Sequence, residues 1–384
     1  MQPVYLDHNA TTPLRAEVLN AMLPYLRTLF GNPSSVHWAG RQAKHGLEEA
    51  REHVARFLHC RPSEIVFTSG GTESNNLALQ GVLHTEQRLH PHVVTTTIEH
   101  SSVLEPLQSL TRHGVEVSLL PVDTEGRISV DDVVAALRPD TALVSIGLAN
   151  HEIGTIQPIE KFSRITRERG IPLHVDAVQA AGKLPLDVTA LGVDLLSLSA
   201  HKINGPKGIG ALYIRKGTAL KAQQLGGPQE RTKRAGTENV AAAVGFGVAA
   251  LLAGQELETN VVRYQHFTTR LRAAILHDIP GTFLNSPEHG CLPNTVNVGF
   301  TNATGEGLMM GLDLAGVAVS TGSACAAGSL EPSHVLLALG RDDNAAKSAL
   351  RFSVGKDTTD QDIDYVLAVL PRIVERVRQA GVKN

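Results

Sequence analysis

Three short polar segments, each directly after an apolar run, contain residue types that can do chemistry. The first, Thr68 to Asn76, reads Thr-Ser-Gly-Gly-Thr-Glu-Ser-Asn-Asn. We expect a helix from Asn75 to His84, whose free amides and positive dipole end would attract an anion. Gly71 would let the backbone approach that anion closely. The segment predicts a phosphate site at Gly71 and Thr72, although a simple tight turn explains a Gly-Gly-Thr sequence equally well.

The second and third segments place a carboxylate and an amine at the ends of apolar strands. Asp176 ends the run Leu-His-Val-Asp, and α/β sheets bind ligands at the carboxyl ends of their strands. An aspartate there could equally cap a helix. Lys202 follows Ser-Ala-His at the end of a later run, and burial in a cleft would favour the neutral amine, which can form a Schiff base. Lys207 competes for this role, and a solvated surface lysine is the other explanation.

Together, the three segments match the needs of pyridoxal phosphate. This cofactor requires phosphate anchors, a lysine that forms a Schiff base, and an acid that pairs with the pyridine nitrogen so that the ring can accept electrons. Each segment alone is ambiguous. Their order along the chain predicts a pyridoxal-phosphate enzyme.

The three cysteines, Cys60, Cys291 and Cys325, have no Cys-x-x-Cys spacing, so we expect neither a disulfide framework nor a metal site. Cys325 lies among small and polar residues in Ser-Thr-Gly-Ser-Ala-Cys-Ala-Ala-Gly-Ser, and a helix is expected to begin near Pro332. This composition is typical of an accessible loop, in which a thiol can act as a nucleophile. A buried, inert thiol is the commoner fate of free cysteine and suits Cys60 or Cys291 better.

Size and charge restrict the classes of protein. The 384 residues predict two or three domains. With 42% hydrophobic and 19% charged residues, a disordered or fibrous chain is excluded. The net charge of −3 gives no reason to expect nucleic acid or an anionic membrane as a partner. No run reaches the roughly 18 apolar residues of a spanning helix, and the first residues lack a signal-peptide pattern, so we expect a cytoplasmic protein.

Short apolar runs that alternate with helix-length segments between about residues 63 and 216 predict a mostly parallel sheet with helices on both faces. The strands expected there are 65–68, 93–97, 143–148, 173–176, 194–199 and 210–214. Further on we expect helices at 240–252, 261–277 and 360–379 and strands at 294–299, 317–320 and 350–354. The fold class is therefore α/β. We expect a large domain at residues 13–259, a smaller α+β domain at residues 1–12 and 260–384, and a ligand cleft between them.

From end to end the chain resembles the cysteine desulfurases, in the branch that includes the nitrogenase and general iron–sulfur cluster assembly enzymes. Besides the segments above, the resemblance is carried by Tyr5-Leu6-Asp7-His8-Asn9-Ala10-Thr11-Thr12, by Gly31-Asn32-Pro33-Ser34-Ser35 and by Arg351-Phe352-Ser353. It implies a fold type I pyridoxal-phosphate enzyme and a homodimer with active sites at the subunit interface.

The resemblance also implies how the cofactor ring is held. Lys202 would form the Schiff base, and Asp176 would pair with the pyridine nitrogen. Gln179 would hydrogen-bond the phenolic oxygen, and His100 would stack on the ring and help to move protons. Without the resemblance, His100 would be interpreted as a core histidine.

The phosphate, the substrate and the sulfur have implied partners too. The phosphate would be bound by Thr72, Ser199 and His201, with Thr237 reaching in from the other subunit. Arg351 would bind the substrate carboxylate through its planar fork of donors, although a surface ion pair is the plainer explanation of that residue. Cys325 would carry the persulfide.

One position departs from the family pattern. Most members have Asn-Asn-Glu before Ile-Gly, whereas this chain has Asn150-His151-Glu152. The second asparagine normally contacts the cofactor oxygen and the substrate carboxylate, and an imidazole can still donate one hydrogen bond there. We expect the contact to survive with an altered pH response, because histidine titrates near neutrality.

The implied reaction removes sulfur from L-cysteine, leaves L-alanine and places a persulfide on Cys325, for iron–sulfur cluster assembly or another sulfur-transfer pathway. A transaminase or a β-lyase on the same fold would need Lys202 and Asp176 but no catalytic thiol. A silent scaffold would keep costly buried polar groups without a use. The resemblance implies a sulfur-acceptor protein without identifying it, and selenocysteine is an open alternative substrate.

Overall fold

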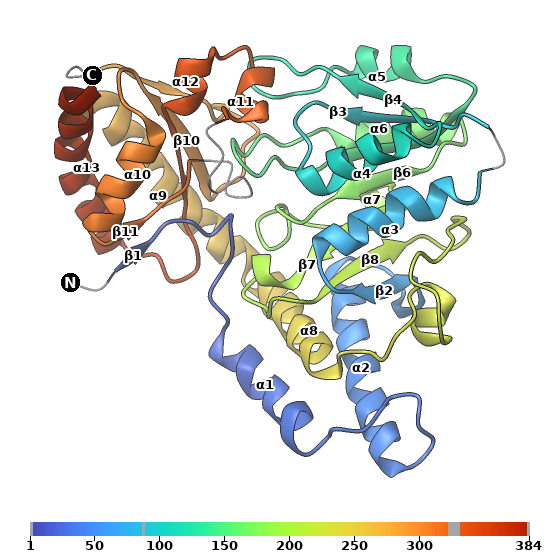
Figure 1. Cartoon of the computed structure of the whole chain (residues 1–384). Helices are drawn as coiled ribbons and strands as arrows, with labels where there is room; N and C mark the ends of the chain where they lie inside the picture. The colour runs from blue at the N-terminus through green and yellow to red at the C-terminus, as the bar shows by residue number, and fades with distance from the viewer. Residues whose placement is uncertain (1–2, 87–88, 322–330, 382–384) are drawn as a thin grey trace.

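The computed structural model describes residues 3–86, 89–321 and 331–381. A seven-stranded sheet forms the centre of the larger part of the molecule (Figure 1). Its strands are β2 (Ile65–Thr68), β3 (His92–Thr96), β4 (Glu116–Leu120), β5 (Thr141–Gly147), β6 (Leu173–Asp176), β7 (Leu195–Ser199) and β8 (Gly210–Ile214). They lie in the order β2-β8-β7-β6-β5-β3-β4, and only β8 runs antiparallel to its neighbours. The predicted mostly parallel sheet is confirmed.

Helices cover both faces of this sheet, because successive strand residues point to opposite sides. Val93 and Leu195 belong to a core cluster with two helices of one face, and Val94 and Leu196 belong to a second cluster with the helices of the other face. The first face is covered by α3 (Gly71–Leu83) and α4 (Ser101–Thr111). The second face is covered by α2 (Trp38–Phe57), α6 (Ile159–Glu168), α7 (Val188–Leu191) and α8 (Val240–Gln255).

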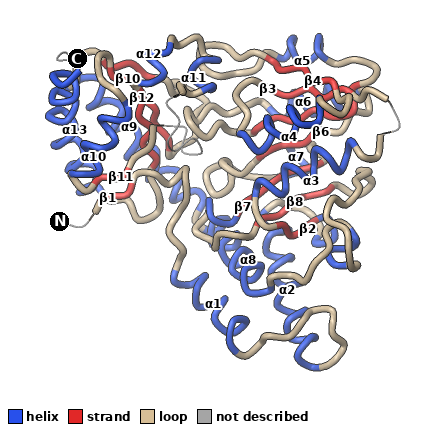
Figure 2. The backbone as a smooth tube through the Cα atoms, viewed as in Figure 1, coloured by secondary structure: helices blue, strands red, loops and turns tan. Residues whose placement is uncertain are grey.

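The remaining helices of this part lie nearer its edges (Figure 2). They are α1 (Ala16–Arg27) and α5 (Val130–Ala136), with short 3₁₀ turns η1 (Pro62–Glu64), η2 (Ala200–Lys202) and η3 (Gln229–Thr232). The turn η2 directly follows β7, so it places the lysine predicted to bind the cofactor at the carboxyl edge of the sheet.

A smaller part contains both chain ends (Figure 1). Its antiparallel sheet consists of β9 (Thr282–Leu284), β10 (Thr295–Phe300) and β12 (Ala349–Ser353), and β1 (Val4–Tyr5) pairs in parallel with β11 (Val317–Ala318). Its helices are α9 (Leu257–Asp278), α10 (Gly305–Leu314), α11 (His334–Ala338), α12 (Asp343–Lys347) and α13 (Asp360–Gly381). Val4 and Leu6 share one core cluster with residues between 264 and 374. The boundaries at residues 12–13 and 259–260 stay a prediction.

Several elements differ from the sequence-based expectation. Helix α3 begins at Gly71, four residues before the expected Asn75, because the turn after β2 is confined to Ser69 and Gly70. Strand β4 was not predicted, since it is a partly exposed edge strand without a continuous apolar pattern. Strand β11 has two residues rather than the expected four.

No single helix within the described ranges is long and apolar enough to cross a membrane. Helices α8 and α9 reach that length and apolar composition only together, and they are bent by 72° at their junction.

A buried ion pair holds a strained turn against the sheet. Glu230, Arg231 and Thr232 have φ values of 43°, 54° and 62°, a left-handed conformation that is costly for residues other than glycine. The Glu230 carboxylate is buried and accepts hydrogen bonds from Nη1 and Nη2 of Arg51 at 2.7 and 2.8 Å and from the Phe67 amide at 2.9 Å. The pair thereby joins η3 to α2 and β2.

We predict that Arg51→Met lowers the free energy of unfolding by about 3–5 kcal/mol, because it leaves the Glu230 carboxylate buried without its cation. The matched control is Arg270→Met, which removes a partly exposed arginine from its ion pairs with Asp360 and Asp364 and should cost about 0–1 kcal/mol. Urea unfolding followed by circular dichroism measures both. Equal losses in the two variants would contradict the prediction.

Candidate active site

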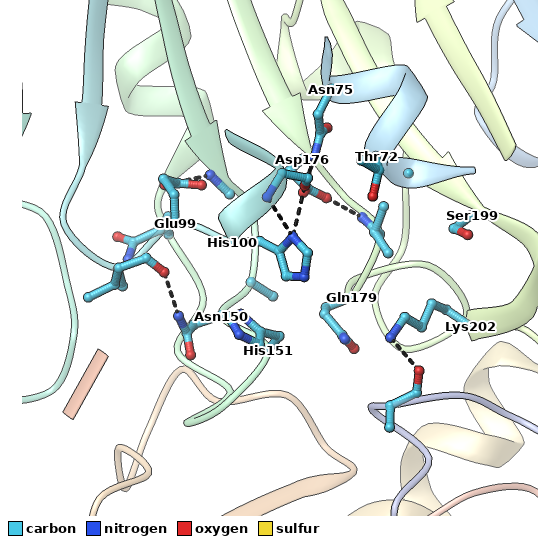
Figure 3. Close-up of a pocket in the computed structure, with 18 of the residues that line it drawn as sticks. Thr72, Asn75, Glu99, His100, Asn150, His151, Asp176, Gln179, Ser199 and Lys202 are labelled. Carbon is cyan, nitrogen blue, oxygen red and sulfur yellow. Dashed lines mark hydrogen bonds between the residues drawn. The ribbon is translucent and has the colours of Figure 1, made fainter. Parts of the chain in front are cut away.

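A cavity of about 270 Å³ lies at the carboxyl edge of the parallel strands (Figure 3). Parallel strands end at the same edge of a sheet, so polar groups that follow different strands meet there. Every predicted cofactor residue except Thr237 lines this cavity: Gly71, Thr72, His100, His151, Asp176, Gln179, Ser199, His201 and Lys202. The ordered segments found in the sequence therefore come together in space.

The start of α3 forms one end of the cavity. Gly71 and Thr72 occupy its first turn, and Ser199 faces them from the end of β7. An ideal Cβ on Gly71 would lie 2.8 Å from Val178 Cγ2, so a side chain there would collide with the turn after β6. Free amides, two hydroxyls and the positive helix end make this region suited to an anion.

Asp176 lies at the end of β6 and is held by two hydrogen-bond donors. Its Oδ1 accepts the Val178 amide at 2.9 Å, and its Oδ2 accepts Nδ2 of Asn75 at 2.7 Å. These two donors fix the orientation of the carboxylate at the edge of the cavity. This group can therefore pair with a protonated ring nitrogen.

Lys202 projects from η2, and its Nζ donates to the backbone carbonyls of Asn9 and, at 2.9 Å, Ala10. The competing Lys207 is exposed and does not line the cavity. His201 Nδ1 lies 3.1 Å from Thr11 Oγ1. Burial, together with Lys202 and Lys207, lowers the pKa of His201 to about 4, so its ring is neutral at neutral pH.

His100 and His151 form an edge-to-face pair with ring centroids 5.2 Å apart. Burial, His100 and Arg351 lower the pKa of His151 well below its ordinary value. The Glu152 carboxylate lies 3.6 Å from His151 Nε2, but burial raises the pKa of that carboxyl. The expected change of charge at His151 near neutrality is therefore wrong: the buried imidazole stays neutral, and its contribution is that of a neutral hydrogen-bonding group.

Two predicted residues lie outside the cavity lining. Arg351 is buried on β12, where Nη2 donates to Asp7 Oδ1 at 2.7 Å and Nη1 to the His151 carbonyl at 3.0 Å, so the surface ion pair considered for it is excluded. Thr237 is exposed and does not reach the cavity of its own chain. Its predicted role requires a second subunit.

The cysteines differ in their capacity to react. Burial raises the pKa of Cys60 to about 12 and that of Cys291 to about 12, so neither supplies the thiolate that sulfur chemistry requires at neutral pH. Cys325 lies outside the described residues. The predicted helix near Pro332 is α11, which begins at His334 and is capped by Ser333.

The residues present fit pyridoxal phosphate. An anion site, an amine and a carboxylate line the same cavity, which matches the phosphate, the aldehyde and the ring nitrogen of the cofactor. Gln179 Nε2 donates one of its two hydrogens to the Asn9 carbonyl at 2.9 Å. Its buried Oε1 has no hydrogen-bond partner among the described residues. A ligand in the cavity can use both groups.

Sequence reasoning missed several residues of the site. Asn75 and Ser102 support Asp176 and His100, and Glu99 and Asn150 also line the cavity. The sequence feature that could have indicated Asn75 is its position near the start of α3, the helix that follows the predicted phosphate segment. Nothing in the local sequence indicated that the carbonyls of Asn9 and Ala10 accept hydrogen bonds from Lys202.

We predict a pH-dependent contribution of Glu99 to stability. Burial raises its pKa to about 7, although Thr96 and the Gly147 amide donate to it. The folded protein holds this proton while the unfolded chain releases it near its ordinary pKa of 4.5. The stabilising contribution is therefore fully present below that value and is lost as the pH rises to about 7. The difference in unfolding free energy between wild type and Glu99→Gln, from urea titrations, should fall over this window and then level off. A flat difference would contradict the assignment.

Comparison with known proteins places the chain in a family. The Aminotransferase class-V family matches residues 4–366. The chain is 49% identical to the cysteine desulfurase IscS of Dictyoglomus turgidum (98% of this chain, 95% of that protein) and 48% identical to that of Methanosarcina thermophila (98% and 93%). A solved NifS-like protein has a TM-score of 0.92 at 39% identity, covering 98% of this chain and 100% of that one. SspA in complex with cysteine has a TM-score of 0.81 at 37% identity, covering 91% and 98%. These likenesses confirm the predicted fold class, and the chain belongs to the cysteine desulfurases of the aminotransferase class-V family.

Proposed function

We propose that this protein is a pyridoxal-phosphate-dependent cysteine desulfurase that converts L-cysteine to L-alanine and carries the sulfur as a persulfide on Cys325. One observation carries the proposal: Lys202, Asp176 and His100 line a single cavity beside an anion site. Full-length similarity to cysteine desulfurases supports the substrate.

The cavity residues have distinct tasks. Bound pyridoxal phosphate supplies an electron sink for negative charge at the substrate α-carbon. Asp176 would hold the ring nitrogen of the cofactor. Lys202 would hold the cofactor through its amine, and the same amine would be the base for the substrate α-proton. His100 would support the ring and move protons through its imidazole.

Arg351 binds the substrate carboxylate in this proposal. Its guanidinium is buried beside Asp7 and the His151 carbonyl, so an incoming carboxylate replaces Asp7 as the anionic partner. A guanidinium suits such an exchange, because the Nη2 group that donates to Asp7 Oδ1 can donate to another carboxylate instead.

The sulfur step requires a thiolate. The Cys325 thiolate attacks the substrate sulfur, a sulfur–sulfur bond forms and the carbon–sulfur bond breaks. The electron pair of that bond returns to the β-carbon, which takes up a proton, and alanine leaves. No external oxidant or reductant is needed. The raised pKa values of Cys60 and Cys291 favour Cys325 among the three cysteines.

We predict that Cys325→Ser binds the cofactor normally but makes no alanine from cysteine, because the sulfur acceptor is missing. Cys60→Ser is the matched control and should keep full turnover. Alanine is measured by amino-acid analysis, and added sulfur on Cys325 by mass spectrometry of the cysteine-treated wild type. Undiminished turnover in Cys325→Ser would remove the nucleophile assignment; pyruvate as the product would indicate a β-lyase, and dependence on a keto acid a transaminase.

We further propose a homodimer in which Thr237 of one subunit completes the phosphate site of the other. Thr237 is exposed and is not among the residues that line its own cavity. Large apolar side chains are exposed at Leu225 (83%), and between α1 and the first residue of α2 at Phe30 (73%), Val36 (87%) and Trp38 (62%). Exposed apolar groups of this size favour association with another surface.

The persulfide must leave Cys325 before a second turnover, which supports a sulfur-acceptor protein as the partner. Iron–sulfur cluster assembly is the pathway that the resemblance favours, and a reducing cytoplasm is the compartment in which a reactive thiol persists.

Mixed dimers test the shared site. Lys202→Ala and Thr237→Val should each be inactive at limiting cofactor. If Thr237 serves the partner's site, unfolding and refolding an equal mixture creates dimers with one intact site and restores about a quarter of wild-type activity. The control mixture of Lys202→Ala and Asp176→Ala should restore none, since both residues serve their own cavity. Absence of recovery in the first mixture would exclude the shared site.

A further inference from the structure

A continuous chain of hydrogen bonds connects Asp176 to His100 through two residues without an assigned role. Nδ2 of Asn75 lies 2.7 Å from Asp176 Oδ2 and 2.8 Å from Ser102 Oγ. Ser102 Oγ lies 2.8 Å from His100 Nδ1, and the Ser102 amide donates to the same nitrogen at 3.1 Å. Figure 3 shows Asn75, Asp176 and His100 together on one side of the cavity.

The chemistry of the donors fixes the direction of this chain. Only the amide nitrogen of Asn75 can face the Asp176 carboxylate, so its two hydrogens go to Asp176 and to Ser102 Oγ. Ser102 Oγ accepts from Asn75, and this strengthens its own hydroxyl as a donor toward His100 Nδ1. The Ser102 amide points at Nδ1 as well, because His100 is the N-cap of α4. Nδ1 therefore receives hydrogens, and the ring hydrogen must be on Nε2.

We propose that Asn75 and Ser102 are positioning residues that hold His100 in its Nε2–H tautomer, so that His100 donates a hydrogen from Nε2 and only accepts hydrogen bonds at Nδ1. The inference rests on the proposed role of His100 beside the cofactor ring and deepens it. It also gives a role to two polar side chains, both buried, that lie behind the proposed catalytic groups.

The network also opposes a second proton on His100. A proton on Nδ1 would face the Ser102 amide, which cannot turn away, and would require the Ser102 oxygen to accept a second hydrogen besides the one from Asn75. Glu99 and Glu152 face His100 electrostatically, and the His151 ring lies across from it. Because Glu99 and Glu152 favour a charged imidazolium when ionised, the experiment has to compare variants at matched pH.

The test reads the tautomer directly. In full-length holoenzyme labelled with ¹⁵N-histidine, two-dimensional NMR shows which ring nitrogen carries hydrogen, and His100→Gln identifies the signal. We expect hydrogen on Nε2. Hydrogen on Nδ1 in the wild-type enzyme would overturn the proposal without reference to any variant.

Variants then test the chain. Asn75→Leu removes the hydrogen bond that favours the Ser102 hydroxyl as a donor, so its oxygen accepts a hydrogen from Nδ1 more readily and the pH midpoint of the His100 signal should rise by about half a unit to one unit, the equivalent of one hydrogen bond. In a Ser102→Ala background, Asn75→Leu should have no further effect, because the link is already broken. Ser109→Ala, a serine exposed on the same helix, is the matched control and should leave the midpoint unchanged.

If Asn75→Leu shifted the pH midpoint of the His100 signal equally in the wild-type and Ser102→Ala backgrounds, the proposal would also be overturned. The NMR measurement does not use cysteine turnover, so a failure of the tautomer proposal can be distinguished from a failure of the desulfurase assignment. A correct tautomer in an enzyme that makes no alanine contradicts the function, whereas a wrong tautomer in an active enzyme contradicts only the roles of Asn75 and Ser102.

Discussion

The carboxylate of Asp176 is the group on which the arrangement of the cavity depends. A carboxylate at the end of a buried strand is expensive unless donors replace the water that it loses. Here the donors come from the next turn of the chain, through Val178, and from helix α3, through Asn75. The helix that carries Asn75 also presents its positive end to an anion. The packing of α3 against the end of β6 would therefore serve both the ring nitrogen and the phosphate of the cofactor.

The first residues of the chain close the other side of the cavity. Val4 and Leu6 belong to the core of the smaller part, whereas the carbonyls of Asn9 and Ala10 accept hydrogen bonds from Lys202 of the larger part. Nδ2 of Asn9 also donates to Thr295 Oγ1 at 2.9 Å and to the His151 carbonyl at 3.2 Å. The two parts of the molecule thus meet through a segment that contacts the reactive amine itself.

Much of this arrangement could be predicted from local sequence. Apolar runs such as 65–68 and 173–176 predicted strands because they are buried on both faces, and the polar residues that follow them predicted the cavity because parallel strands share an edge. Contacts between distant segments could not be predicted in this way. The pairing of Arg351 with Asp7, the bond from Asn75 to Asp176 and the burial that keeps His151 neutral all depend on tertiary packing, which local patterns do not encode.

The strained turn at Glu230 has a consequence for the order of folding and assembly. Three consecutive left-handed residues cost roughly 1–3 kcal/mol each, and the interactions that offset this cost come from Arg51 on α2 and Phe67 on β2. The turn is therefore stable only after that helix and strand have docked. Thr237 follows the turn by five residues, so in the proposed dimer it would reach its final geometry only after α2 and β2 have docked.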